Sequence, residues 1–127
     1  MYPENLRYSR DHEWARADGD EIVIGITHYA QEELGDVVFV ELPAVDTVIV
    51  SDQEIGEVES TKATSSIYSP VSGKIVEVNT ELEDHPEYIN KDPYGQGWLA
   101  VVELSNPAEV NSLMTASQYE EFLSSQS

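Results

Sequence analysis

One lysine, Lys62, lies in the acidic and hydroxylated stretch "EVESTKATSSIYSP", residues 57–70. Only two other lysines, Lys74 and Lys91, occur among the 127 residues, so a lysine-rich solvated face does not account for it. A lysine can remain a solvated charge, form a Schiff base or accept a covalent modification. A Schiff base needs a desolvated amine with a depressed pKa, and the polar, acidic neighbours of Lys62 oppose this. A solvated turn residue and a modification site remain open.

Other residues with chemical potential form weaker patterns. The three histidines, His12, His28 and His85, lie in different expected elements and share no metal-ligand spacing. Carboxylate pairs arise by chance in so acidic a chain, which weakens a glycosidase-like interpretation; the pairs considered are Asp36 with Glu41 and Glu32 with Glu33. The absence of cysteine excludes disulfides, Cys-ligated metals and a thiol nucleophile of the chain's own.

Composition predicts one acidic globular domain spanning residues 1–127. Hydrophobic residues make up 40% of the chain, enough for one core. The formal net charge of −19 disfavours nucleic acid and anionic membranes as partners and favours basic patches on proteins. The N-terminus has neither signal-peptide nor transit-peptide character, and no apolar run reaches membrane-spanning length. We therefore expect a cytoplasmic protein; a mitochondrial matrix location would require a leader that has been removed.

Short strands are expected over the first four fifths of the chain. A hairpin turning at Asp18-Gly19 places Ile22, Ile24 and Ile26 on one face. A helix follows over 28–34, with Thr27 as N-cap and Gly35 as its end, and then a strand over 36–42 that is apolar on both faces and so expected to be covered on both sides. Further strand candidates are "DTVIV", "EIGEVES", "SSIYSP", "GKIVEVN" and "WLAVVEL".

Helical signals follow. The polar segment 79–97 separates the last two strands and begins with a capping box at Thr80 and Glu83. A C-terminal helical segment over 106–123 contains two short helices, and the final "SSQS" is expected to fray. Their expected caps are Asn106 with Pro107 and Glu109, and Thr115 with Gln118. The fold class predicted from these patterns is mostly β, a sandwich or barrel of short strands.

The stretch "VESTKATSSIYSPVSGKIVEVN", residues 58–79, resembles the lipoyl-attachment hairpin of the glycine cleavage system H protein family. The resemblance covers nearly the whole chain. Lipoyl domains of 2-oxoacid dehydrogenases and biotinyl domains share the hairpin but not the "DPYGQGW" loop or the helical C-terminus. Further motifs similar to the family, in order and spacing, are "HEW", "IGIT", "AQEELGDVVFVELP", "INKDPYGQGW" and "LSNPAEVNSLM".

The resemblance implies a flattened lipoyl-domain-like barrel or sandwich of antiparallel strands, with its core hairpin at 54–79. It also implies lipoic acid amide-linked to Lys62 and a carrier that does no catalysis itself. Such an arm takes an aminomethyl group from a pyridoxal-phosphate-dependent glycine decarboxylase to an aminomethyltransferase and is reoxidised by dihydrolipoyl dehydrogenase. A lipoate ligase or lipoyl transferase attaches the group.

Site residues implied by the resemblance fall into three groups. Lys62 is the attachment site, and Gly73 is expected to shape the hairpin through a positive φ angle or by allowing close approach of another segment. Residues expected to take part in hairpin recognition are Glu59, Ser60, Thr61 and Ala63. A cleft that shelters the arm is expected at the first helix, residues 28–34, and neighbouring strand ends, with His28, Tyr29 and Glu33 nearby in sequence. Family members often carry a histidine where this chain has Tyr29.

The resemblance leaves one alternative open. An H-like protein that acts in lipoyl-group transfer or lipoate biosynthesis, rather than in glycine oxidation, would keep the same lysine and the same hairpin. Carbon dioxide release from glycine in the presence of glycine decarboxylase distinguishes the two functions.

Overall fold

A computed structural model describes residues 2–126 of the chain. The prediction of a mostly β protein with short helices is confirmed. In chain order the elements are β1 (Arg7–Tyr8), β2 (Glu13–Asp18), β3 (Glu21–Ile26), α1 (His28–Leu34), β4 (Val37–Glu41), β5 (Val48–Ile49), β6 (Glu54–Ser60), β7 (Thr64–Tyr68), β8 (Gly73–Val78), α2 (Glu81–Asp84), α3 (Tyr88–Lys91), β9 (Ala100–Leu104), α4 (Ala108–Asn111) and α5 (Ala116–Gln126).

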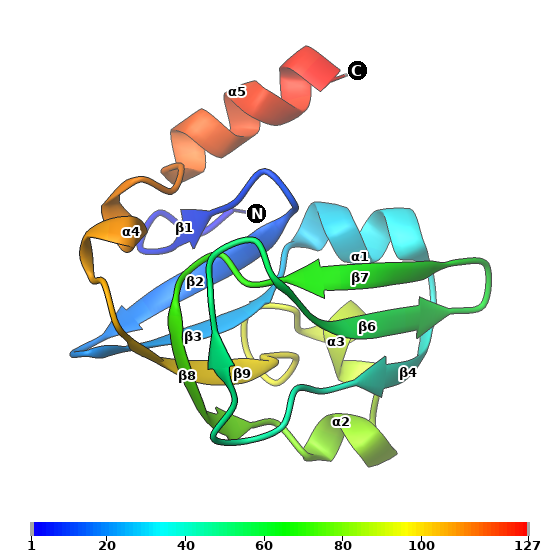
Figure 1. Cartoon of the computed structure of the whole chain (residues 1–127). Coiled ribbons are helices and arrows are strands. Elements are labelled where there is room, and N and C mark those ends of the chain that lie inside the picture. The colour runs from blue at the N-terminus through cyan, green and yellow to red at the C-terminus, as the bar shows by residue number, and fades with distance from the viewer. Residues whose placement is uncertain (1, 127) are drawn as a thin grey trace.

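The strands form two antiparallel sheets (Figure 1). The larger sheet has the order β1-β2-β3-β9-β8-β5, and the smaller sheet has the order β4-β6-β7. Each sheet keeps two open edges in the described part of the chain, so the arrangement is a sandwich and not a closed barrel. The expected core hairpin 54–79 is therefore divided: β6 and β7 pair in the small sheet, whereas β8 belongs to the large one.

The β2–β3 hairpin is confirmed, but its turn lies one residue later than expected. Asp18 pairs with Glu21, so the two turn residues are Gly19 and Asp20, and Gly19 has a φ of 67°. Ile22, Ile24 and Ile26 are buried, as predicted from their alternation. Hydrophobic residues on the opposite face are buried too, because the N- and C-terminal segments cover that side of the sheet.

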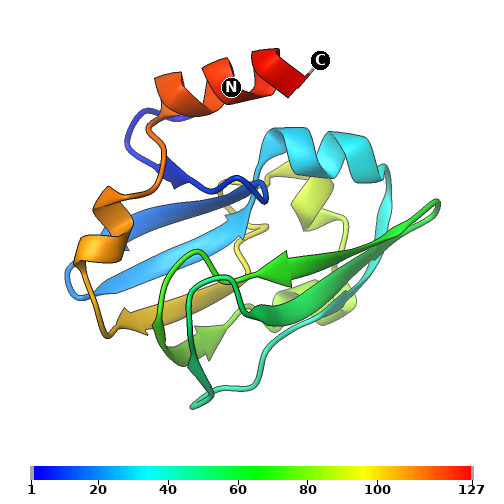
Figure 2. The same ribbon diagram turned by 45° about the horizontal axis from the view of Figure 1, so that its top comes forward.

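Apolar side chains fill the space between the sheets and a second layer outside the large sheet. The inner cluster beside α1 includes Ile26, Leu34, Val58 and Ile67. The outer cluster joins β1 and β2 to α5 and contains Leu6, Tyr8, Trp14, Val23, Ala116 and Tyr119. Figures 1 and 2 show α5 lying over the edge of the large sheet that contains β1.

The prediction that strand 36–42 is covered on both sides is wrong. Val38 and Phe39 in β4 are 50% and 55% exposed. β4 is an edge strand of the small sheet, and its register shifts between Val37 and Phe39. Only Val37 and Val40 turn inward, so the other apolar side chains of this strand face outward.

The helix ends follow the predicted chemistry in part. Thr27 caps α1 by accepting the Ala30 N–H, and Gly35 ends the helix. Thr115 and Gln118 form the expected reciprocal capping box of α5. Thr80 makes no side-chain cap to α2.

The remaining C-terminal predictions need correction. α4 has no side-chain cap, because the Glu109 carboxylate accepts hydrogen bonds from the Ser72 N–H and hydroxyl instead of completing a box. The structure places residues 124–126 in α5, and the expected fraying of the final residues stays a prediction. Ser127 lies outside the described residues.

Candidate functional site

Lys62 occupies the tip of the β6–β7 hairpin, as the sequence predicted. Glu59 pairs with Thr64, which leaves the intervening residues to form the turn. Lys62 is exposed, and none of the ion pairs within residues 2–126 includes it. Figures 1 and 2 show the hairpin projecting past the end of α1. The lysine is thus displayed for contact with other molecules.

Ser60 builds this turn. Its hydroxyl accepts hydrogen bonds from the Lys62 N–H at 3.2 Å and the Ala63 N–H at 3.0 Å. The same hydroxyl donates to the Ala63 carbonyl, and the Ser60 N–H closes the turn on that carbonyl at 2.8 Å. Ser60 is buried and its hydroxyl bonds within the turn, whereas Thr61 and Ala63 are exposed beside the lysine. A recognition role for Glu59, Ser60, Thr61 and Ala63 stays a prediction.

The tip rests against the C-terminal end of α1. The Thr61 N–H donates to the Asp36 carbonyl at 3.0 Å. A Cβ built on Gly35 would lie 3.4 Å from Cε of Lys62, so the lysine stem passes directly over this glycine. Gly35 has a φ of 80°, in the region that favours glycine.

Asn90, which sequence reasoning missed, fixes the same end of the helix. Its amide group donates to the Gly35 carbonyl at 2.8 Å and to Oε1 of Gln31 at 3.0 Å, and its Oδ1 accepts the Val37 N–H at 2.8 Å. The "INKDPYGQGW" segment therefore braces the support on which the lysine tip lies.

A positive φ angle was one of the two reasons expected for a glycine at position 73, but Gly73 does not have one. Within residues 2–126 the glycines with positive φ are Gly19 and Gly35. The other expected reason, close approach, agrees with the structure. A Cβ on Gly73 would collide with the Glu103 carbonyl oxygen and lie 2.8 Å from Cγ1 of Val102. Gly73 thus serves the β8–β9 pairing of the large sheet rather than the lysine hairpin.

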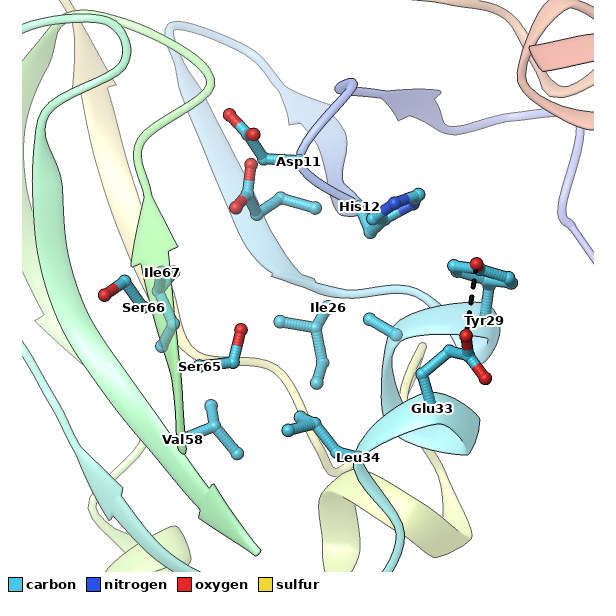
Figure 3. A pocket seen from close by; sticks show the side chains of 12 residues that line it. Asp11, His12, Ile26, Tyr29, Glu33, Leu34, Val58, Ser65, Ser66 and Ile67 are labelled. Atoms are coloured by element: carbon cyan, nitrogen blue, oxygen red, sulfur yellow. Dashed lines mark hydrogen bonds between the residues drawn. The ribbon is translucent and has the colours of Figure 1, made fainter. Parts of the chain in front are cut away.

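A cleft of about 180 Å³ lies between α1 and β7 (Figure 3). Its deeper walls are apolar and its rim is polar. The lining residues are Asp11, His12, Glu13, Ile26, Tyr29, Ala30, Glu33, Leu34, Val58, Ser65, Ser66 and Ile67. Because Leu34 directly precedes Gly35, the cleft extends along α1 from the end where the lysine stem lies.

Two of the three expected cleft residues line it. Tyr29 and Glu33 lie one turn apart on α1, and the Tyr29 hydroxyl donates to Glu33 at 3.3 Å (Figure 3). His28 lies outside the cleft. Its Nε2 is 3.1 Å from Glu32, its N–H donates to the Tyr94 hydroxyl, and Gln31 contacts its Nδ1.

The sequence did not indicate that a third side of the cleft comes from the turn before β2 and the start of that strand. Asp11 and His12 enter the cleft from this turn and Glu13 from the start of β2, while Ser65 and Ser66 enter from β7, opposite α1. The "HEW" motif was the available signal, but nothing local in sequence predicts that residues 11–13 face a helix that begins at residue 28.

Glu13 is the most perturbed acid of the site. Burial raises its pKa to about 7, although hydrogen bonds from the Ser9 hydroxyl and the Tyr68 N–H act in the opposite direction. The two bonds measure 2.6 and 3.2 Å. Glu13 therefore links the large sheet to β7 and changes charge near neutral pH.

No group of three or more potential metal-ligating side chains lies together within residues 2–126. Across the same residues, none of the helices has the length and apolar character needed to span a membrane.

The fold and site together define a two-sheet domain that displays one lysine at a hairpin tip next to a small cleft. A sequence model described as "Glycine cleavage H-protein" matches residues 6–126. The glycine cleavage system H protein of Brevibacillus brevis is 57% identical over 119 residues, covering 94% of each chain. That of a Geobacillus strain is 54% identical over 121 residues, covering 95% of each.

Solved structures agree with the sequence comparison. The crystal structure of a glycine cleavage system H protein from Mycobacterium marinum has a TM-score of 0.88 and 44% identity, covering 96% of this chain and 98% of that one. The chain belongs to the glycine cleavage H-protein family.

Proposed function

We propose that Lys62 bears an amide-linked lipoyl group and that this arm carries an aminomethyl group and electrons between the enzymes of the glycine cleavage system. The observation that carries the proposal is the position of the lysine: exposed, free of ion pairs in the described residues, and directed from a hairpin tip toward the end of a cleft. Membership of the H-protein family makes the chain a carrier of that system.

The dimensions of the cleft suit the arm. About eight bonds separate Nζ from the far sulfur of a lipoyl group, which at about 1.2 Å per bond gives about 10 Å of reach. The seven residues of α1 rise by about 10 Å, so an arm starting beside Gly35 can follow the helix along its length. The volume of about 180 Å³ is below that of a typical small-molecule site and fits the end of an arm rather than a separate ligand.

The chemistry of the walls also suits such an arm. Ile26, Leu34 and Ile67 offer an apolar surface to an alkyl chain. At the rim, the exposed carboxyl groups of Asp11 and Glu33 would attract a cationic amine. We propose that the cleft shelters the arm, when it bears its amine cargo, from water between visits to the enzymes.

The chain itself is proposed to be non-catalytic. It has no cysteine, so the dithiolane of a bound lipoyl group would supply the redox and group-transfer chemistry, while the protein attaches, orients and shelters that group. The proposed partners are glycine decarboxylase, aminomethyltransferase, dihydrolipoyl dehydrogenase and the lipoate ligase or lipoyl transferase. A net charge of −19 favours basic docking faces on these enzymes and predicts that salt weakens association.

We propose a cytoplasmic location, in keeping with the bacterial sources of the relatives. The alternative function in lipoyl-group transfer or lipoate biosynthesis is not favoured, because the relatives compared above are named for the glycine cleavage system.

The decisive experiment begins with intact-mass measurement after treatment with lipoate ligase, lipoate and ATP. The wild-type protein and Lys74→Arg should each gain one lipoyl amide, because Lys74 lies in β8 beside Asp46, away from the hairpin tip. The lipoylated protein should then support carbon dioxide release from glycine by purified glycine decarboxylase. Lipoylation without such release, together with transfer of the lipoyl group to another apo-carrier, would favour the alternative.

A further inference from the structure

A hydrogen-bond chain joins the cleft to the C-terminal helix. The Ala30 N–H donates to Oγ1 of Thr27 at 3.2 Å, the Thr27 hydroxyl lies 2.8 Å from that of Tyr119, and the Tyr119 hydroxyl lies 2.7 Å from Nδ1 of His12. Thr27 and Tyr119 are fully buried. The chain thus runs from the first turn of α1, through α5, to a residue that lines the cleft.

This chain determines where His12 holds its proton. If Nδ1 is unprotonated, Thr27 donates to Tyr119 and Tyr119 donates to His12, so every hydroxyl proton has an acceptor. If Nδ1 carries a proton, either the Thr27 or the Tyr119 hydroxyl proton loses its acceptor in a buried position, which is costly. The geometry therefore selects the neutral ring protonated on Nε2.

The surroundings of His12 hold the ring in place. Its φ of 68° is uncommon for a residue other than glycine and places the side chain between α1 and α5. The ring centroid lies 4.7 Å from that of Tyr29, which lines the cleft, and 6.0 Å from that of Phe122 on α5. The His12 carbonyl also accepts the Thr27 N–H at 3.0 Å.

We propose that His12 is a positioning residue of the arm cleft, held by the Tyr119 hydroxyl as a neutral ring protonated on Nε2, so that the C-terminal helix fixes one wall of the cleft. This inference rests on the proposed function of the cleft as the shelter of the arm. A neutral ring leaves the carboxylates of Asp11 and Glu33 available to an amine, whereas a charged ring would compete for them and repel the amine.

The electrostatic environment agrees with a neutral ring. Burial lowers the pKa of His12 and outweighs the opposing effects of Asp11, its neighbour in sequence, and Glu33, on α1. Tyr119 faces the ring from α5 as an uncharged hydroxyl, because burial raises the pKa of that group. The Arg10 guanidinium stacks on Phe122 at 5.3 Å from its ring centroid.

The test compares two variants that each remove one hydroxyl from the same aromatic stack. Tyr119→Phe removes the bonds to His12 and Thr27. Tyr8→Phe removes a bond to the Pro3 carbonyl and serves as the control from the same stack, since the Tyr8 and Tyr119 ring centroids lie 4.8 Å apart. Nitrogen NMR of histidine-labelled protein without the lipoyl group reports the His12 tautomer. Formaldehyde release from the lipoylated protein, loaded with glycine and glycine decarboxylase, reports the lifetime of the aminomethyl cargo.

In the wild type and Tyr8→Phe we expect the Nε2-protonated tautomer alone. In Tyr119→Phe we expect both tautomers and a cargo lifetime shorter by about two- to tenfold, the factor that one ordinary hydrogen bond supports. An unchanged tautomer in Tyr119→Phe overturns the proposal, and so does a changed tautomer with a cargo lifetime equal to that of Tyr8→Phe.

The wild-type protein alone tests whether the cleft holds the arm. If loading the lipoylated, histidine-labelled wild-type protein leaves the His12 resonances unchanged, the arm does not use this cleft. The positioning role is then overturned together with the cleft assignment, whatever tautomer His12 adopts.

Discussion

The hairpin tip contacts the C-terminal end of α1, whereas the cleft runs along the helix, and the two regions are built in contrasting ways. At the C-terminal end, Lys62 stands on a turn made by its own neighbours, chiefly through the Ser60 hydroxyl. In the cleft, His12 and Glu13 depend on partners from distant segments, including Tyr119 and Tyr68. The polar bonds of the tip therefore come from neighbours in sequence, whereas those of the cleft join segments far apart in the chain.

Substitution of Lys62 is expected to have the largest effect, and this effect should be confined to the hairpin tip. Lys62→Arg should abolish lipoylation, because a guanidinium offers no amine to acylate. The free energy of unfolding should change by no more than about 0.5 kcal/mol, as is usual for an exposed turn residue. Intact mass after ligase treatment and a thermal melt check both parts. Acquisition of one lipoyl amide by the variant would move the attachment site to another lysine, with Lys74 next in line.

Gly73→Val tests whether stability and lysine presentation are independent. The new side chain would collide with the Glu103 carbonyl and should lower the free energy of unfolding by about 3 kcal/mol. Because Gly73 lies in the large sheet and lacks a positive φ, the folded fraction should still be lipoylated at the wild-type rate. Ligase turnover normalised to folded protein measures this, and a slowed rate would show that β8 controls the geometry of the tip.

Glu13→Gln tests the cleft through the pH dependence of the free energy of unfolding. The folded-state pKa of about 7 lies above the ordinary value of 4.5, so the folded protein retains a proton that the unfolded chain releases between these values. The contribution of Glu13 to stability therefore falls as pH rises from about 4.5 to about 7. At pH 8 the variant should be more stable than the wild type by about 2 kcal/mol, with little difference at pH 4.

Denaturant unfolding of the protein without its lipoyl group, at several pH values, measures this difference. Glu33→Gln is the control, because it removes an exposed carboxyl group from the same cleft. Parallel pH profiles for the wild type and Glu13→Gln would mean that Glu13 ionises normally in the folded protein.

The smallest expected effect concerns the tip. Ser60→Ala removes the acceptor of the Lys62 and Ala63 N–H groups and should cost about 1 kcal/mol. Since the turn then loses its local brace, lipoylation should slow without being lost. Thr64→Ser, at the exposed first residue of β7, is the control for ligase turnover. Equal rates in Ser60→Ala and the control would show that the ligase does not require this turn geometry.

Local sequence was sufficient for most elements and for the lysine. Thr27 and Gly35 bound α1 as predicted, and the runs on either side of Lys62 form the expected hairpin. These features depend on neighbours within a few residues, where capping, turn chemistry and alternation act directly. The exposure of Val38 and Phe39 escaped prediction because an apolar strand pattern does not distinguish a strand covered on both sides from an edge strand.

The lining of the cleft could be predicted from the sequence only in part. Tyr29, Glu33 and His28 were all expected near the cleft from their place on the first helix, but only Tyr29 and Glu33 line it. Asp11, His12 and Glu13 reach the cleft only through the packing of the sheets. Sequence determined the carrier-type hairpin, its lysine and the acidic character of the chain. Tertiary structure alone decided which strands became edges, why Gly73 must be small, and which carboxylate is buried deeply enough to titrate near neutrality, because burial and close approach depend on segments far apart in the chain.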